Sequence, residues 1–240
     1  MDTSQIFNRP IENIVLWFVA FLFSLSVHES AHAWTSEKFG DDTGRYQGRI
    51  TLNPMAHIDP IGTILIPLFG FLSSGFSFIG WAKPVETNPL SWRNKKLANI
   101  CVAGAGPLSN LILATITFTI IKVLTLTRVL VLDYEGNDVY DLLRPALSGQ
   151  PILGALAKLL GIMLMLNIAL AIFNMIPVPP LDGSHILESL LPESAAEKYA
   201  AIRPYGFMLL LGLMYTGIFG TIIGPVYFLT YKLMGFKMAG

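Results

Sequence analysis

Long apolar stretches alternate with shorter polar connections along this 240-residue chain. A helix needs about 20 apolar residues to cross the hydrocarbon core of a bilayer. Four stretches reach that length, at residues 12–36, 98–124, 151–177 and 205–231. The pattern predicts a membrane-spanning helix in each of them. The last stretch contains Gly224-Pro225, and because proline lacks the N–H that continues a helix, the sequence predicts a break there.

A fifth apolar stretch, 61–80, has a different pattern. Pro67, Gly70 and the Ser-Ser-Gly that follows divide it into two halves, each too short to span a bilayer alone. The segments on either side of it, 44–60 and 81–88, are rich in turn-forming residues and are expected to be extended chain and turns. The residues between the second and third spanning stretches are expected to form a short acidic polar loop.

Composition supports a membrane protein. Apolar residues make up 53% of the chain, charged residues only 13%, and the mean hydropathy is +0.58. Soluble domains usually carry about a quarter charged residues. We therefore expect an all-α polytopic membrane protein of about 4–6 membrane helices, folded as a single domain over residues 1–240. Sixteen basic residues balance sixteen acidic ones, which argues against a nucleic-acid partner.

The most informative motif lies inside the first spanning stretch. His28 and His32 flank Glu29 in the pattern His-Glu-x-x-His. On a helix the two histidines project from one face, one turn apart, so both can bind one Zn²⁺ at about 2.0–2.1 Å. Glu29 is then placed to take a proton from a water at the metal. The alternative is a pair of buried histidines that are hydrogen-bonded to neighbouring helices.

A catalytic zinc needs at least one further protein ligand. His57, His185 and the carboxylates are the candidates. Asp182 follows the proline-rich end of the third spanning stretch, on a rigid turn that could direct its carboxylate at a metal. Physics alone leaves open the alternative of a plain helix-terminating turn with a solvated aspartate. His57 has a similar pair of interpretations: contact with the metal or the substrate, or a loop histidine bonded to backbone.

Two motifs together resemble the site-2 protease family of intramembrane zinc metalloproteases. The first is His-Glu-x-x-His, and the second is Asn-x-x-Pro-x-Pro-x-x-Asp-Gly at residues 174–183. The run Ala-Gly-Ala-Gly-Pro at 103–107 is similar to a helix start in the same family. The resemblance covers about residues 12–190, the expected catalytic core, and leaves 205–236 as a C-terminal helical region. The PDZ and CBS domains that many relatives carry have no counterpart here.

The resemblance implies roles for individual residues. It implies His28, His32 and Asp182 as ligands of one catalytic Zn²⁺, and Glu29 as the general base. Asn174 matches the motif asparagine and is expected to contact the substrate strand or the reacting carbonyl. Family members cleave transmembrane proteins near or within the bilayer, so transmembrane substrates and the lipid bilayer are the expected partners. The sequence does not indicate an oligomeric state.

The two motifs can meet only if the first and third spans end on the same side of the membrane. A full crossing by 61–80 would put them on opposite sides, whereas a re-entrant hairpin puts them together. The sequence therefore predicts a hairpin at 61–80. Such non-helical backbone is tolerated at membrane depth where it is buried in protein or lines a watery cavity.

Basic residues predict the orientation. Nine fall on the site side of the hairpin arrangement: Lys38, Arg45, Arg49, Lys83, Arg93, Lys95, Lys96, Lys198 and Arg203. The opposite side holds mainly Arg9, Arg128 and Arg144. Because cytoplasmic loops carry an excess of basic residues, we expect a multi-pass protein of the cell membrane whose site faces the cytoplasm.

A zinc transporter, or a metal-binding membrane scaffold without protease activity, is the alternative function. Transporters usually distribute carboxylates and histidines along several spanning helices to form a path. The ionisable residues of the spans here gather at one depth, which favours a single reaction site.

Overall fold

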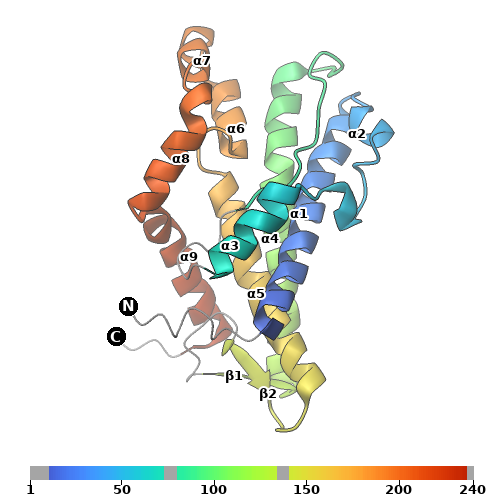
Figure 1. Cartoon of the computed structure of the whole chain (residues 1–240), viewed down its shortest axis with the longest axis vertical. Helices are drawn as coiled ribbons and strands as arrows, with labels where there is room; N and C mark the ends of the chain where they lie inside the picture. Colours follow the sequence, from blue (N-terminus) through green and yellow to red (C-terminus); the bar gives the residue numbers. More distant parts are fainter. Residues whose placement is uncertain (1–10, 73–79, 134–140, 237–240) are drawn as a thin grey trace.

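Three long helices form the centre of the protein. The computed structural model describes residues 11–72, 80–133 and 141–236. Within it α1 (Ile11–Lys38), α4 (Lys95–Leu126) and α5 (Pro151–Asn174) are each long and apolar enough to cross a membrane, and they pack against one another (Figure 1). They confirm three of the predicted spans.

The fourth predicted span is bent. It comprises α8 (Gly206–Tyr215) and α9 (Ile218–Met234), which meet at an angle of 65°. The break predicted at Gly224-Pro225 was wrong, because Pro225 lies inside α9. The chain turns instead at Gly217, whose φ of 73° is a left-handed conformation that glycine adopts without steric cost. The described residues thus hold three spans, or four if the bent pair is one, at the lower end of the predicted range.

In the region predicted as a hairpin, the chain returns at Trp81 to a point close to where the region begins. It begins with a π-helical turn, η3 (Pro60–Leu65), and α3 (Ile66–Leu72), which together are too short to span. The Trp81 N–H donates to the Gly62 carbonyl at 3.1 Å. A single crossing would separate these residues by about 30 Å, so the contact supports the re-entrant arrangement. Residues 73–79, with the predicted Ser-Ser-Gly break, lie outside the described part.

Helical turns interrupt the connection between α1 and this hairpin. The sequence predicts extended chain and turns at 44–60, and the turns there are one turn of α-helix, α2 (Thr43–Tyr46), and the 3₁₀ turn η2 (Pro54–Ala56). The Asn53 carboxamide starts the second turn by accepting from the Met55 N–H at 3.1 Å. Residues 81–88 carry no regular helix or strand up to the turn at their end, in keeping with the extended chain predicted there.

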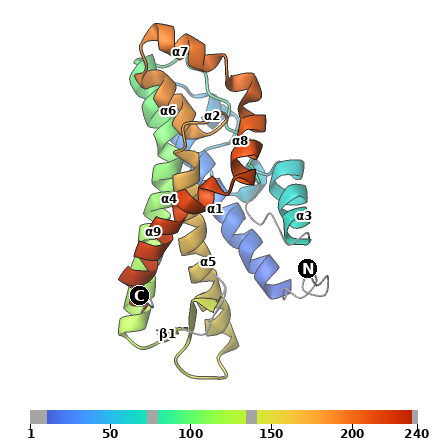
Figure 2. The same cartoon turned by 90° about the vertical axis from the view of Figure 1, so that its left-hand side faces the viewer.

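Opposite ends of the molecule carry different elements. At one end a two-stranded antiparallel sheet joins β1 (Leu130–Leu132) to β2 (Leu143–Pro145), where the sequence predicts only a polar loop. At the other end α2, α6 (Asp182–Leu190) and α7 (Glu193–Ala200) gather, followed by the turn η5 (Arg203–Tyr205). Figures 1 and 2 show α1 and α5 running from the sheet end towards this second end, so their C-terminal ends point the same way, as predicted.

The outer surface of the helices is apolar. On α4, large hydrophobic side chains stand exposed over its whole length: Leu108, Leu111, Ile112, Ile116, Ile120 and Val123. The same holds for α8 and α9, including Met208, Leu211 and Phe228. An exposed apolar surface of this extent would be unstable in water but matches the hydrocarbon of a bilayer. The fold is therefore that of an all-α polytopic membrane protein.

Candidate metal centre

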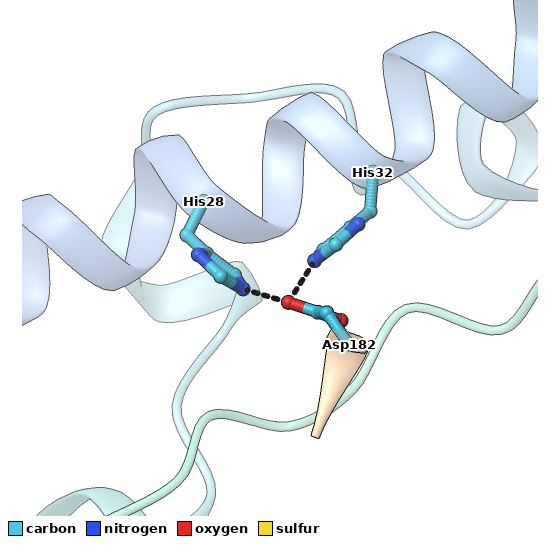
Figure 3. A group of neighbouring side chains, drawn as sticks. All are labelled: His28, His32 and Asp182. Carbon is cyan, nitrogen blue, oxygen red and sulfur yellow. Dashed lines mark ion pairs between the residues drawn. The ribbon is translucent and has the colours of Figure 1, made fainter. Parts of the chain in front are cut away.

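Two histidines and one aspartate meet between α1 and the start of α6. The Nε2 atoms of His28 and His32 lie 3.2 and 3.5 Å from the same oxygen, Oδ2 of Asp182 (Figure 3). The three ligand atoms all lie within 4.8 Å of one another. The His28 and His32 side chains are 6% and 11% exposed, and the aspartate side chain is 17% exposed. A residue 150 positions beyond His32 thus completes a buried cluster of metal-ligand type.

The turn after α5 places Asp182. It contains the Pro179-Pro180 pair, joined by a cis peptide bond, and the Leu181 N–H donates to the Val178 carbonyl at 2.9 Å. Any Cβ at Gly183 would overlap the backbone of Met175 at the end of α5. Only glycine lets the start of α6 fold back this tightly, and Asp182, the first residue of α6, then faces α1.

The Nδ1 atom of each imidazole, which does not face Asp182, has a hydrogen-bond partner. The Nδ1 atom of His32 lies 2.6 Å from the Val102 carbonyl on α4. A carbonyl can only accept, so His32 carries a proton on Nδ1, and in its neutral form it directs the lone pair of Nε2 into the cluster. The Nδ1 atom of His28 lies 2.6 Å from the Asn110 side-chain oxygen, also on α4. Both rings are therefore oriented from behind by the same helix.

Gly106 leaves the space in front of the two rings open. A Cβ at this position of α4 would stand 2.5 Å from the His28 Nε2 atom and still closer to that of His32. Real side chains essentially never show such a short contact. Gly106 thus allows α4 to pack closely against α1, and the groups it approaches are the two imidazoles.

The donor set fits zinc. Two imidazole nitrogens and one carboxylate oxygen are a common protein ligand set for catalytic Zn²⁺, which keeps a further position for water. Asp182 Oδ2 is buried, and among the described residues its polar neighbours are the two Nε2 atoms, with no further hydrogen-bond partner. When His32 is neutral, the lone pairs of its Nε2 atom and of the carboxylate converge on one point, an arrangement that a cation stabilises. The gap that Gly106 leaves gives that cation room.

Glu29 is held next to the cluster by the returning hairpin segment. Its Oε2 atom accepts the Val85 N–H at 3.1 Å. The same segment is also held two residues earlier, because the Lys83 N–H donates to the His57 carbonyl at 2.9 Å. Glu29 is half-buried. Its carboxylate is thus positioned by backbone, one residue along α1 from His28.

Asp41 ties this segment to the end of α1. Its carboxylate accepts the Asn88 N–H at 2.7 Å, the Ser36 hydroxyl at 2.8 Å and the Thr43 N–H at 3.0 Å. Burial by itself would raise the pKa of Asp41, but these bonds outweigh it and hold the pKa below its ordinary value. Asp41 therefore stays ionised and keeps residues 81–88 against α1.

The other candidate residues lie outside the cluster. His57 is 2% exposed, and its Nε2 atom lies 3.0 Å from the Thr51 carbonyl, so it is a buried loop histidine rather than a third ligand. His185 is not part of the cluster of described residues, and burial followed by the Arg203 charge lowers its pKa. The Asn174 amide donates to the Leu170 carbonyl of its own helix at 3.0 Å. Contact of Asn174 or His57 with substrate stays a prediction.

Sequence reasoning missed the supporting groups. Asn110 lies three residues beyond the Ala-Gly-Ala-Gly-Pro run at 103–107, but nothing in the sequence connects it to His28, 82 positions away. The Val102 carbonyl and the Val85 N–H are backbone atoms, which no residue type can reveal. The spacing of Gly106 and Asn110, one helical turn apart, places both on one face of α4 and is the only available signal.

Comparison with known proteins decides the family. The sequence model of peptidase family M50 matches residues 16–213, a stretch that includes the three clustered residues and Glu29. The chain belongs to peptidase family M50. This confirms the resemblance to the site-2 proteases. As an M50 protein it is a zinc metalloprotease by class and a multi-pass membrane protein by its helices.

Individual relatives agree with the family. The M50 protein is 36% identical over 217 residues to YwhC of Bacillus subtilis (strain 168), named as a candidate zinc metalloprotease, and the match covers 90% of this chain and 88% of YwhC. It is 28% identical over 211 residues to Rip2 of Mycolicibacterium smegmatis, named in the same way, with 87% of this chain and 71% of Rip2 covered. No solved structure is significantly similar to this M50 protein.

Proposed function

We propose that this protein is an intramembrane metalloendopeptidase of the site-2 type, which hydrolyses peptide bonds of transmembrane proteins. The observation that carries the proposal is the convergence of His28, His32 and Asp182 on one point beside Glu29, on a helix whose length and apolarity suit a membrane. Ionisable groups at membrane depth are costly and are usually functional. The catalytic core spans about residues 12–190.

The proposed roles follow from the geometry. His28, His32 and Asp182 hold one zinc ion. Bound zinc acts as a Lewis acid that polarises a carbonyl and makes water more acidic. Glu29 takes the proton from the attacking water on its carboxylate and returns it to the leaving amine. The Val85 N–H, which bonds Oε2 of Glu29, leaves the other carboxylate oxygen for this proton transfer.

The extended segment beside Glu29 suits an unwound substrate strand. In extended chain, successive residues turn their backbone groups to opposite edges. The N–H groups of Trp81, Lys83 and Val85 face Gly62, His57 and Glu29. Ala82 therefore turns its N–H and carbonyl towards the opposite edge, where a substrate strand would pair, whereas Pro84 has no N–H and offers only its carbonyl there. Asn174, at the end of α5, is proposed to contact that strand.

The site is proposed to face the cytoplasm. The elements at the site end carry the nine basic residues named above, including Arg93, Lys95 and Lys96 at the start of α4, which are exposed. At the sheet end Lys158 is paired with Glu12 at 3.5 Å. The imbalance of basic residues supports a cytoplasmic site by the positive-inside rule.

A Glu29→Gln variant tests the proposal. The amide keeps the shape of the side chain but cannot take up the proton, so cleavage of a model transmembrane substrate in proteoliposomes should fall by about 10²–10⁴-fold. Zinc content should stay at the wild-type level, because Glu29 is not one of the clustered ligands. Glu12→Gln, at the exposed start of the same helix, is the control and should cleave normally.

Two results would contradict the proposal. Normal cleavage by Glu29→Gln would exclude Glu29 as the base. Zinc flux into liposomes without any cleavage by the wild type would favour the transporter alternative. Among the described residues only one group of histidine and acidic side chains could hold a metal, whereas a transport path needs several.

A further inference from the structure

Three buried polar side chains lie behind His28, one from each central helix. Ser24 belongs to α1, Asn110 to α4 and Asn167 to α5, and each is 0% exposed. Asn110 contacts His28, whereas Asn167 contacts Asn110 and does not reach the metal cluster. Uncharged amides this deep between apolar helices are costly unless every polar atom is bonded.

The Asn167 side chain, at one end of this group, has an amide whose orientation is fixed. The Asn167 Nδ2 atom lies 2.8 Å from the backbone carbonyl of Met163 and 2.9 Å from the Ser24 hydroxyl. A carbonyl oxygen can only accept, so the atom facing it must be the amide nitrogen of Asn167. Its oxygen is thereby turned to the other side, towards α4.

The orientation of the Asn167 amide in turn determines the orientation of the Asn110 amide. The Asn110 Nδ2 atom lies 2.9 Å from the Asn167 oxygen and donates to it. Its own oxygen is therefore the atom that faces His28 Nδ1 at 2.6 Å. An amide oxygen can only accept, so His28 carries a proton on Nδ1, and in its neutral form it presents an unprotonated Nε2 to the cluster.

The two histidines differ in what determines which ring nitrogen carries the proton. The Nδ1 atom of His32 faces the Val102 backbone carbonyl, which cannot be reversed. The partner of His28 is a side-chain amide, which by itself could present either its oxygen or its nitrogen. If it presented the nitrogen, His28 would carry its proton on Nε2, where a metal has to bind.

We propose that Asn167 is a positioning residue that fixes the tautomer of His28 through Asn110, and so prepares His28 as a zinc ligand. The proposal rests on the proposed function, because it assumes that His28 binds zinc. The Met163 carbonyl fixes the orientation of the Asn167 amide on α5. That amide fixes the orientation of the Asn110 amide on α4, which in turn fixes the position of the proton on His28 of α1.

An Asn167→Leu variant tests this. Leucine has a similar volume but cannot accept from Asn110, whose amide is then held in its orientation only by the longer contact of Nδ2 with the Ser24 carbonyl at 3.5 Å and can reverse more easily. Apparent zinc affinity, measured by chelator competition on the purified protein, should fall by about 10- to 100-fold. Ser24→Ala is the matched control in the same buried group. It leaves the Met163 carbonyl bond in place and should bind zinc close to wild type.

A double variant separates direction from structure. In Asn167→Leu/Asn110→Asp the carboxylate accepts through either oxygen, so it bonds the His28 Nδ1–H whichever way it turns. Zinc affinity should return close to the wild-type value. A purely structural role of Asn167 would leave the double variant as weak as the single one, or weaker, and would overturn the proposal.

The tautomer can also be read directly. ¹⁵N NMR of histidine-labelled, zinc-free protein at mildly alkaline pH should show His28 protonated on Nδ1 in the wild type and redistributed towards Nε2 in Asn167→Leu. An unchanged tautomer, or unchanged zinc affinity, would overturn the proposal. If the wild type bound no zinc, the proposed function would fail, and this NMR comparison would still decide whether Asn167 sets the tautomer.

Discussion

At the scale of single residues, Gly106 shows how little room the metal cluster has. It is the position of α4 that faces both imidazoles, and its missing side chain leaves the space a metal would take. Glycine inside a helix costs about 1 kcal/mol relative to alanine. A helix that retains glycine here gives up that stability for the open space beside His28 and His32.

Gly106→Ala should therefore abolish the site without unfolding the helix. The added methyl group occupies the space between the Nε2 atoms, so zinc affinity should fall at least about tenfold, while alanine favours the helix. Zinc content and circular dichroism check the two parts. Gly104→Ala is the matched control, since a Cβ there meets only Ile186 at an ordinary 3.9 Å. Equal zinc binding by both variants would disprove the steric account.

Residues of the site differed in how far the sequence could predict them. The pair His28 and His32 was accessible because one helical turn is a local property. Asp182 depended on the resemblance to a family, since nothing local determines which carboxylate reaches α1. Asn110 and Asn167 could not be predicted at all, because their roles arise only where α4 and α5 meet α1.

At the scale of elements, Asp41 fixes the segment that holds Glu29. Its carboxylate joins the end of α1, the start of α2 and the N–H of Asn88. Since the pKa of Asp41 is lower in the folded protein than in the unfolded chain, its contribution to stability is complete at neutral pH. That contribution declines as the pH falls below about 4, through the lowered folded pKa.

Asp41→Asn should remove this pH dependence. The amide loses the charge-assisted bonds, so the free energy of unfolding at neutral pH should drop by about 1–3 kcal/mol. The difference from wild type should then shrink below about pH 4. Thermal unfolding in detergent at several pH values measures both effects. Asp42→Asn, at the exposed neighbouring residue, should behave as wild type; equal losses in both variants would refute the role of Asp41.

Elements were predictable where the pattern was long. The three central helices begin and end within three residues of the apolar stretches that predict them. Short elements were not: α2 and the strands β1 and β2 have three or four residues, too few for a periodic pattern. The predicted break was misplaced: the sequence predicts it at Gly224-Pro225, whereas the chain bends at Gly217. A proline within a membrane helix can be accommodated by neighbouring helices.

At the scale of the whole molecule, the requirement that two distant motifs meet explains the path of the chain. The C-terminal ends of α1 and α5 point to the same end of the protein, and Gly62 and Trp81 bring the hairpin back to where it started (Figure 1). An extra crossing between α1 and α4 would separate His28 from Asp182. The proposed orientation relative to the cell rests on the distribution of basic residues.

Cysteine labelling tests that orientation. Cys101 is the only natural cysteine, so single cysteines can be introduced after Cys101→Ser. In intact cells an impermeant maleimide should label Ser148→Cys, beyond β2, and should reach Ser194→Cys, in α7, only after lysis; both positions are exposed. The reverse pattern would place the site outside the cytoplasm.

The zinc content of the purified protein tests the central claim most directly. The chain has four histidines, so each can be replaced by alanine in turn and zinc counted per chain. The wild type should carry about one zinc. His28→Ala and His32→Ala should lose it, whereas His57→Ala and His185→Ala should keep it. Zinc retained in both of the first two variants, or lost only from the last two, would contradict a metal centre at His28, His32 and Asp182.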